Sequence, residues 1–323
     1  MKAIVAHEFG GPEVLKYEEV PDPVPGPGEV VFDVVAIGVN PAETYMRTGT
    51  YAVKPDLPYI PGGDAAGMIS EVGEGVTELK VGDRVFCGAA LGRDMTGCYA
   101  ERVKRPAAHV MKLPANVDYA QGAALGVPWV TAHYALFARG GGRPGETVFI
   151  HGASGAVGTA AIQLARRAGM KAIGSGGSAR GRELIESLGA KAVDHTAEGY
   201  LDEVCEAAGG EGPAMILEML ANVNLANDLE LLAKFGRVIV IGNRGEVTIN
   251  PRLTMMKELD IRGIALWNAD QELVRDILEN LISGLEDGSL SPVVGREMPL
   301  AEAAAAHEAV LAPGRVGKLV LVP

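Results

Sequence analysis

Residues 146–169 read ETVFIHGASGAVGTAAIQLARRAG and combine three patterns in direct succession. Residues 148–150 form a short apolar run, which is typical of a strand buried on both faces. Apolar residues then recur at helical spacing from Val157 to Ala168, and Gly169 follows as a helix stop. The stretch therefore predicts a strand, a glycine turn and an amphipathic helix, which together begin a parallel βαβ unit.

The glycines of this turn have physical roles that suggest a ligand. Gly155 has no Cβ, so a pyrophosphate can approach the backbone, and Gly158 lets the helix pack closely on its strand. The first N–H groups of the helix then point at the phosphates. Ala153 stands where the first glycine is usual. The turn predicts a dinucleotide-binding site because a strand precedes it and a helix follows it.

The second strand, 171–175, ends without the acidic residue that would bind an adenosine 2′-hydroxyl. Gly177, Ser178, Arg180 and Arg182 follow instead. Arginine forks suit phosphate oxygens, so the sequence favours NADP(H) over NAD(H). In the alternative interpretation, both arginines only solvate the first turn of a helix at 182–188.

Composition limits the classes of protein that fit. The chain has 323 residues with 48% hydrophobic residues and a net charge of −12, which argues against general affinity for nucleic acid or anionic membranes. No apolar stretch approaches the roughly 20 residues that span a bilayer, and no signal-peptide pattern is visible. Three cysteines are too few for a disulfide framework. We expect a cytoplasmic α/β enzyme of two domains.

The pattern along the chain predicts where these domains lie. Turn-rich β segments fill 1–118, and strands alternate with helices over 119–262, which indicates a doubly wound parallel sheet. Residues 263–323 contain a periodic helix at 274–285 and a closing strand at 318–322. Residues 260–266 form an apolar edge-strand candidate, so we expect a homodimer or larger homo-oligomer that covers this edge.

Five segments in order give the whole chain a family resemblance. They are Phe9–Leu15, Val39–Tyr45, Pro61–Gly67, His151–Gly155 and Glu218–Leu225. In these segments the chain resembles the zinc-free quinone oxidoreductase (zeta-crystallin) family of the medium-chain dehydrogenase/reductase superfamily. The resemblance implies a Rossmann domain at 119–262 and a β-rich GroES-like catalytic domain formed by 1–118 and 263–323.

Zinc ligands of related dehydrogenases are missing from the corresponding positions. Gly63 stands where those relatives have histidine, residues 38–43 contain no cysteine, and no Cys-x-x-Cys pair occurs. We therefore expect no metal, with Asp64 making a structural hydrogen bond. Without a Lewis acid, the substrate must accept hydride readily, as quinones do.

The resemblance also implies the site residues. Asn40, Tyr45 and Tyr51 would face the nicotinamide across the interdomain cleft as proton donors or orienters, although both tyrosines could simply pack their rings. His195 could equally be a loop residue. His151 is interpreted as structural, and so is Glu218, because no acidic partner is visible for it in the sequence. Lys318 is interpreted as a surface or hinge charge, and the family match leaves a phosphate contact open for it. The implied NADPH contacts are Tyr45, Thr131, Ser154, Gly155, Ala156, Val157, Gly177, Ser178, Arg180, His195, Asn224, Ile241, Gly242, Asn243, Arg244, Ile264, Ala265 and Leu266.

Three functions remain open from the sequence. The first is NADPH-dependent reduction of small quinones, and the second is NADPH-dependent reduction of an activated alkene such as an enone. In the second reaction a positioned acid must protonate the α-carbon, so Tyr45 should matter more. The third is a non-enzymatic role as a lens protein or RNA-binding protein, which no basic or aromatic pattern here favours.

Overall fold

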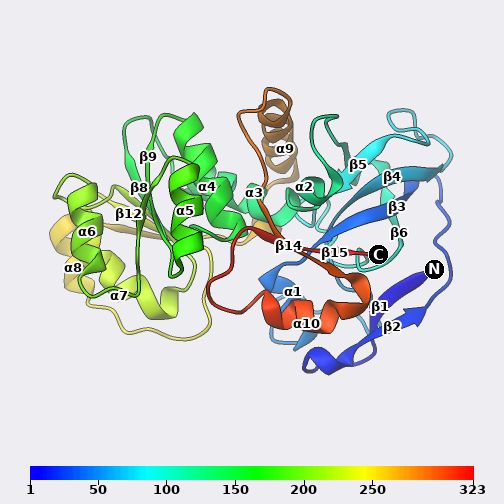
Figure 1. Cartoon of the computed structure of the whole chain (residues 1–323), viewed down its shortest axis with the longest axis horizontal. Coiled ribbons are helices and arrows are strands. Elements are labelled where there is room, and N and C mark those ends of the chain that lie inside the picture. The colour runs from blue at the N-terminus through cyan, green and yellow to red at the C-terminus, as the bar shows by residue number, and fades with distance from the viewer. The chain divides into compact units, whose positions relative to one another are not determined.

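Six parallel strands form the centre of one of two units in the computed structural model, which describes residues 1–323 (Figure 1). The strand order is β10-β9-β8-β11-β12-β13, so the strands extend in both directions from β8. This is the doubly wound order of a Rossmann sheet, as predicted. The strands are β8 (Thr147–Ile150), β9 (Lys171–Ser175), β10 (Lys191–Val193), β11 (Met215–Glu218), β12 (Arg237–Val240) and β13 (Asp260–Gly263).

Helices connect these strands, and all but the last of them bury apolar residues. Val148, Phe149 and Ile150 of β8 are fully buried, which explains their unbroken apolar run. Because every pairing in this sheet is parallel, all carboxyl ends of the strands meet at one edge. The helices are α3 (Gly126–His133), α4 (Ala156–Arg167), α5 (Ala179–Ser187), α6 (Tyr200–Ala207), α7 (Ala221–Leu231) and α8 (Pro251–Lys257).

Two boundaries differ from the sequence prediction. The last strand ends at Gly263 rather than at residue 266, because a 3-10 turn begins at Leu266. The helix predicted at 182–188 begins three residues earlier, at Ala179, since Ser178 is its N-cap. Arg180 and Arg182 therefore both lie in the first turn of α5.

The second unit contains a seven-stranded, mainly antiparallel sheet with the order β14-β15-β3-β4-β5-β7, in which β6 also pairs with β3. A two-stranded sheet, β1-β2, accompanies it. The strands are β1 (Lys2–Ala6), β2 (Leu15–Glu19), β3 (Glu29–Gly38), β4 (Asp64–Val72), β5 (Arg84–Cys87), β6 (Arg102–Pro106), β7 (Val110–Lys112), β14 (Val294–Pro299) and β15 (Lys318–Val322).

Four helices complete this unit, namely α1 (Pro41–Arg47), α2 (Tyr119–Ala123), α9 (Gln271–Glu286) and α10 (Ala303–Ala309). The β-rich start and the closing strand are confirmed, as is the tail helix around Val274–Leu285. The two units consist of 1–128 with 270–312 and 317–323, and of 129–269 with 313–316. The domain limits predicted after residues 118 and 262 stay a prediction. None of the helices combines the length and apolar character needed to cross a bilayer.

Strand β13 is the outer edge of the parallel sheet, because it pairs only with β12. Exposed apolar side chains lie on and near this edge: Ile261 is 42% exposed, Phe235 61%, Met256 70% and Met255 76%. An uncovered apolar sheet edge promotes association with another chain.

We predict that β13 is covered by the same strand of a second copy. Light scattering at micromolar concentration should give at least twice 33.7 kDa. Ile261→Lys should weaken the assembly, whereas Val81→Lys, at a residue 63% exposed in the other unit, should leave it unchanged. A monodisperse wild-type monomer would contradict this use of the edge.

Candidate nucleotide-binding edge and active-site network

The loop between β8 and α4 has the backbone that a phosphate site requires. Gly152 has φ +57°, in the left-handed region that favours glycine. A Cβ at Gly158 would lie only 2.4 Å from Ala153 Cα, so only glycine allows the helix to pack this closely on the loop. The predicted packing role of Gly158 thus has a direct structural cause.

The N-terminus of α4 carries no side-chain cap. Gly155 is the N-cap residue and no side chain bonds the first N–H groups, which belong to Ala156, Val157 and Gly158. Ser154 is buried, and its hydroxyl donates to the Arg315 carbonyl at 2.9 Å. This end of a twelve-residue helix is therefore a fitting place for an anion.

The two arginines that follow β9 have different surroundings. Arg182 Nη1 lies 2.7 Å from Asp194 Oδ2 and donates to the Gly176 carbonyl at 3.2 Å. Arg180 is exposed on the same first turn of α5. The Ser178 hydroxyl accepts a hydrogen bond from Gly181 N at 3.1 Å. Arg182 is therefore engaged within the protein, whereas Arg180 is exposed, so the choice between phosphate binding and solvation of the helix start remains open for Arg180.

Most of the other predicted cofactor contacts follow further strands of this sheet. His195 packs over Gly177, where a Cβ would lie 2.9 Å from its Cε1 atom. Asn224 lies on α7 rather than in a loop, and its Nδ2 donates to Glu218 Oε1 at 3.1 Å. Thr131 is the exception, since it is buried on α3. The segments after β12 and β13 contain Ile241, Gly242, Asn243, Arg244, Ile264, Ala265 and Leu266.

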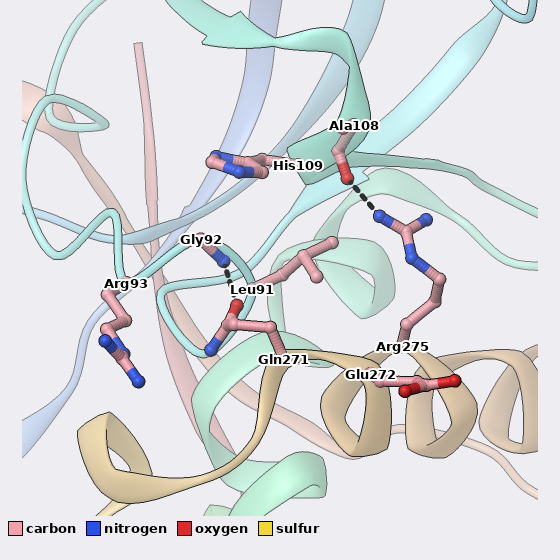
Figure 2. A pocket seen from close by; sticks show the side chains of 8 residues that line it. All are labelled: Leu91, Gly92, Arg93, Ala108, His109, Gln271, Glu272 and Arg275. Carbon is pink, nitrogen blue, oxygen red and sulfur yellow. Dashed lines mark hydrogen bonds between the residues drawn. The ribbon is translucent and has the colours of Figure 1, made fainter.

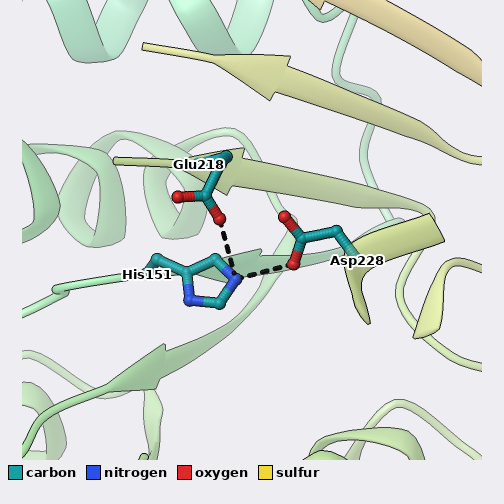
Figure 3. Close-up of side chains that lie close together, drawn as sticks. All are labelled: His151, Glu218 and Asp228. Atoms are coloured by element: carbon teal, nitrogen blue, oxygen red, sulfur yellow. Dashed lines mark hydrogen bonds and ion pairs between the residues drawn. The ribbon is translucent and has the colours of Figure 1, made fainter. Parts of the chain in front are cut away.

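Beneath this edge, His151 lies between two carboxylates (Figure 3). Its Nε2 atom is 2.8 Å from Asp228 Oδ1 and 3.2 Å from Glu218 Oε2, and all three side chains are buried. The assumption that Glu218 has no acidic partner is wrong, because α7 brings Asp228 beside it. Burial raises the pKa values of Glu218 and Asp228 to about 7 and lowers the pKa of His151.

In the β-rich unit, Asn40 belongs to a buried polar network. Its Nδ2 donates to Asp64 Oδ2 at 2.9 Å and to Glu43 Oε1 at 3.1 Å. Its Oδ1 accepts a hydrogen bond from Lys318 Nζ at 2.5 Å. Asn40 is also the N-cap of α1, the helix that contains Tyr45. Both ends of the Asn40 amide are therefore engaged with the protein.

Lys318 is not the surface charge that the sequence analysis expected. It is 2% exposed, and its ammonium lies 3.3 Å from Asp64 Oδ2. Asp64 also accepts from the backbone N–H groups of Ala89 and Val127, which confirms its structural hydrogen bonding. Burial lowers the pKa of Lys318, and the Asp64 carboxylate opposes that shift. The pair places opposite charges together, as buried charges require.

Sequence reasoning missed a second buried chain of polar groups next to this network. The Tyr99 hydroxyl donates to Glu43 Oε2 at 2.7 Å and therefore accepts from His307 Nε2 at 3.1 Å. Burial raises the pKa values of Glu43 and Tyr99, and it lowers that of His307 to about 3. The N-cap spacing Asn40-x-x-Glu43 was a readable local signal, but nothing local pointed to His307.

Tyr45 and Tyr51 lie together, with ring centroids 6.4 Å apart and planes inclined by 28°. Both rings are half-buried. The Tyr45 carbonyl accepts hydrogen bonds from the backbone of Thr50 and Tyr51, which folds the segment back on α1. Burial raises the pKa of Tyr51 to about 12, so its phenol keeps its proton at neutral pH.

The comparisons agree with this geometry. Residues 26–115 match the family model of the alcohol dehydrogenase GroES-like domain, and residues 156–283 match that of the zinc-binding dehydrogenase. The quinone oxidoreductase of Rattus norvegicus is 47% identical over 325 residues, which cover 100% of this chain and 98% of the relative.

Solved structures share the fold along the whole chain. An NAD-dependent alcohol dehydrogenase has a TM-score of 0.92 at 29% identity, and the Escherichia coli quinone oxidoreductase complexed with NADPH has 0.86 at 28%. Each match covers 100% of both chains. The chain is thus an oxidoreductase with the medium-chain dehydrogenase/reductase fold. It belongs to the quinone oxidoreductase family.

The residues around Asp64 do not fit the zinc ion that one of the matched family models suggests. A Cβ at Gly63 would lie 2.4 Å from the Ala89 Cβ, so no side chain fits at the position of the histidine ligand. The Lys318 ammonium and two backbone N–H groups already contact the Asp64 carboxylate. A cation there would meet another cation.

We therefore predict that dialysis against a strong chelator leaves turnover unchanged. Metal analysis of the purified protein should be run on the same samples, because His151, Glu218 and Asp228 offer three ligand atoms within 4.8 Å of one another. Stoichiometric zinc whose removal abolishes activity would overturn this prediction.

His307 should make the fold sensitive to acid. Its pKa falls from the ordinary 6.5 to about 3 in the folded chain, so below pH 6.5 the unfolded chain binds the additional proton and stability is lost as pH falls. We expect this residue to cost about 2 kcal/mol of unfolding free energy between pH 7 and pH 5. Denaturant unfolding of His307→Gln should show a pH dependence smaller by this amount. An unchanged dependence would show that His307 is not buried as a neutral ring.

Proposed function

We propose that this protein reduces small quinones with electrons from NADPH. The observation that carries the proposal is the carboxyl edge of the parallel sheet, where the uncapped N-terminus of α4 and the exposed Arg180 lie on neighbouring βα units. The E. coli relative solved with NADPH and the rat relative are both quinone oxidoreductases, which supports the assignment. The structurally similar NAD-dependent dehydrogenase shows that the fold alone does not choose the cofactor.

In this proposal each part of the edge holds a different part of the cofactor. Ser154, Gly155, Ala156 and Val157 bind the pyrophosphate through backbone N–H groups. The other candidates from His195 to Leu266 border the riboses and the nicotinamide, and Thr131 approaches from α3. When bound, NADPH supplies the hydride equivalent that the acceptor takes up.

The adenosine phosphate would be bound by Gly177, Ser178 and Arg180. Arg182 is already neutralised by Asp194 at 2.7 Å, whereas no ion pair engages the exposed Arg180. No acidic residue ends β9, and the Asp194 carboxylate after β10 is already paired with Arg182. We therefore assign the 2′-phosphate to Arg180, the choice that the sequence left open.

NADPH should bind at least about tenfold more tightly than NADH, a difference of about 1.4 kcal/mol. Arg180→Glu should narrow this ratio because it replaces the attracting charge with a repelling one. Arg182→Gln is the matched control, since that residue lies on the same turn but pairs with Asp194. Equal affinities in the wild type, measured by titration calorimetry, would refute the preference. An Arg180 variant with an unchanged ratio would refute the assignment.

The acceptor needs little help from the protein if it is a quinone. Its carbonyl oxygens gain charge as the ring becomes aromatic, so positioning and a weak proton donor suffice. We propose that Tyr45 and Tyr51 orient the acceptor and hold protons at their hydroxyl oxygens. Asn40 is a positioning residue in this scheme, because its amide fixes the start of α1 through Asp64 and Lys318.

Substitution of Tyr45 distinguishes quinone reduction from enone reduction. If the protein is a quinone reductase, Tyr45→Phe should keep a large part of the turnover. If it is an enone reductase, the same variant should lose nearly all turnover, because it lacks the acid that protonates the α-carbon. Tyr17→Phe, at an exposed ring on β2, is the control for loss of a hydroxyl alone. Stopped-flow oxidation of NADPH against both acceptor classes gives the readout. If the wild type turns over enones faster than quinones, and Tyr45→Phe abolishes the enone activity, the protein is an enone reductase and our assignment is wrong.

A further inference from the structure

Two of the three cysteines form a pair that the proposed reaction does not use. Cys87 ends β5, and Cys98 follows the ten-residue segment 88–97, which we call the pocket loop. Their Sγ atoms are 3.7 Å apart, and the two residues are 2% and 0% exposed. The third, Cys205, lies on α6 in the other unit. Two sulfurs in van der Waals contact need only a small movement to bond.

A buried guanidinium lies against this pair. Arg105 of β6 is 8% exposed, and its Nη2 donates to Cys98 Sγ at 3.1 Å and to the Thr96 carbonyl at 2.5 Å. Its nearest carboxylate oxygen, Asp94 Oδ2, is 3.8 Å from Nε. A buried cation beside sulfur stabilises a thiolate. The hydrogen bond with Cys98 lowers the pKa of Cys87, and the nearby Arg105 charge lowers it further, whereas burial raises the pKa of Cys98.

The pocket loop connects the cysteines to the surface. Leu91, Gly92 and Arg93 line a pocket of about 430 Å³ (Figure 2). Gly92 N donates to Gln271 Oε1 at 2.7 Å across this pocket. Residues 92–97 are at least partly exposed, while the cysteines at its ends are buried. Opening of this one short loop would therefore bring a small solute to the sulfurs.

The same loop has a strained backbone. Gly92, Arg93 and Gly97 all have positive φ, at +73°, +62° and +97°. Arg93 adopts this conformation although it has a Cβ, so its backbone is strained. His109 Nδ1 lies 2.7 Å from Asp94 Oδ2, so a single carboxylate contacts both the pocket wall and the Arg105 guanidinium. The loop is thus held by a few polar contacts around the cysteine pair.

We propose that Cys87 and Cys98 are a redox-active dithiol, which a small hydroperoxide converts into a disulfide that closes the pocket loop. Cys87 attacks the terminal peroxide oxygen as its thiolate and becomes a sulfenic acid, and the peroxide leaves as an alcohol or as water. The Cys98 sulfur then attacks the sulfenic sulfur and expels water. The two thiols lose two protons and two electrons in total, and the hydroperoxide takes up both.

The oxidised protein should differ in the loop that lines the pocket. Cys87 pairs with Ala65 of β4 in the sheet, and the Cys98 backbone N–H donates to the Gly62 carbonyl at 3.0 Å, so the bond requires small shifts of both cysteine side chains. The bond would draw the end of the loop towards β5 and fix the segment that carries Arg93 and Asp94. Oxidation would thus change the shape of this pocket, and this change does not depend on the proposed quinone reaction.

The test treats the reduced protein with hydrogen peroxide near stoichiometric concentration and maps its peptides without reduction. We expect one cross-linked peptide pair joining Cys87 to Cys98, lighter by two hydrogens than the sum of its parts. One free thiol, Cys205, should remain of the original three. Cys205→Ser is the matched control and should form the same disulfide. Two cysteines that stay thiols, or that advance separately to sulfinic acids, would overturn the proposal.

Two variants test the order of the steps. In Cys98→Ser, a dimedone-type reagent should trap a sulfenic acid at Cys87. In the wild type the reagent should trap little, because Cys98 converts the sulfenic acid into the disulfide first. Arg105→Met should slow disulfide formation by about tenfold through loss of the thiolate-stabilising charge. Arg102→Met, on the same strand but paired with Asp33 and Glu71, should not. No trapping at Cys87, or equal rates in the two arginine variants, would contradict the mechanism.

Discussion

The contact between Gly158 and Ala153 sets the geometry on which the nucleotide-binding edge depends. With 2.4 Å between the position of a Cβ and the Ala153 Cα atom, any side chain at residue 158 would force α4 away from the loop. The N-terminal N–H groups of α4 are useful only if they remain at the carboxyl end of β8. The parallel pairing of β8 with β9 and β11 then puts the other candidate residues at the same edge.

A second constraint acts in the β-rich unit, where charges are buried without solvent. Lys318 and Asp64 satisfy one another, and the Asn40 amide bridges them to Glu43. Removing one partner would leave an uncompensated buried charge, which is far more costly than the pair itself. The same cation disfavours a metal ion at Asp64. In our account the network serves to hold the start of α1, and with it Tyr45, in a fixed place.

Local patterns in the sequence predicted the parts of the structure that neighbouring residues determine. The β8–α4 unit, the missing acid after β9 and the tail helix are encoded by runs and spacings that survive any tertiary arrangement. Partners distant in sequence were not predictable in this way. Asp228 reaches His151 only because α7 packs back on the sheet, and Lys318 reaches Asp64 only because β15 pairs with β3. The cysteine pair is a similar case, since contact between Cys87 and Cys98 requires the pocket loop to fold back.

Hydrogen exchange in the presence of NADPH tests the central claim most directly. If the carboxyl edge of the parallel sheet holds the cofactor, amides at 154–158 and 177–181 should gain protection on addition of NADPH, because the cofactor then covers both segments and its phosphate oxygens accept from the first N–H groups of α4. The peptides of β1 and β2, which form the two-stranded sheet, serve as an internal reference. If NADPH binds strongly but the amides of 154–158 and 177–181 exchange as fast as in the free protein, the account is contradicted.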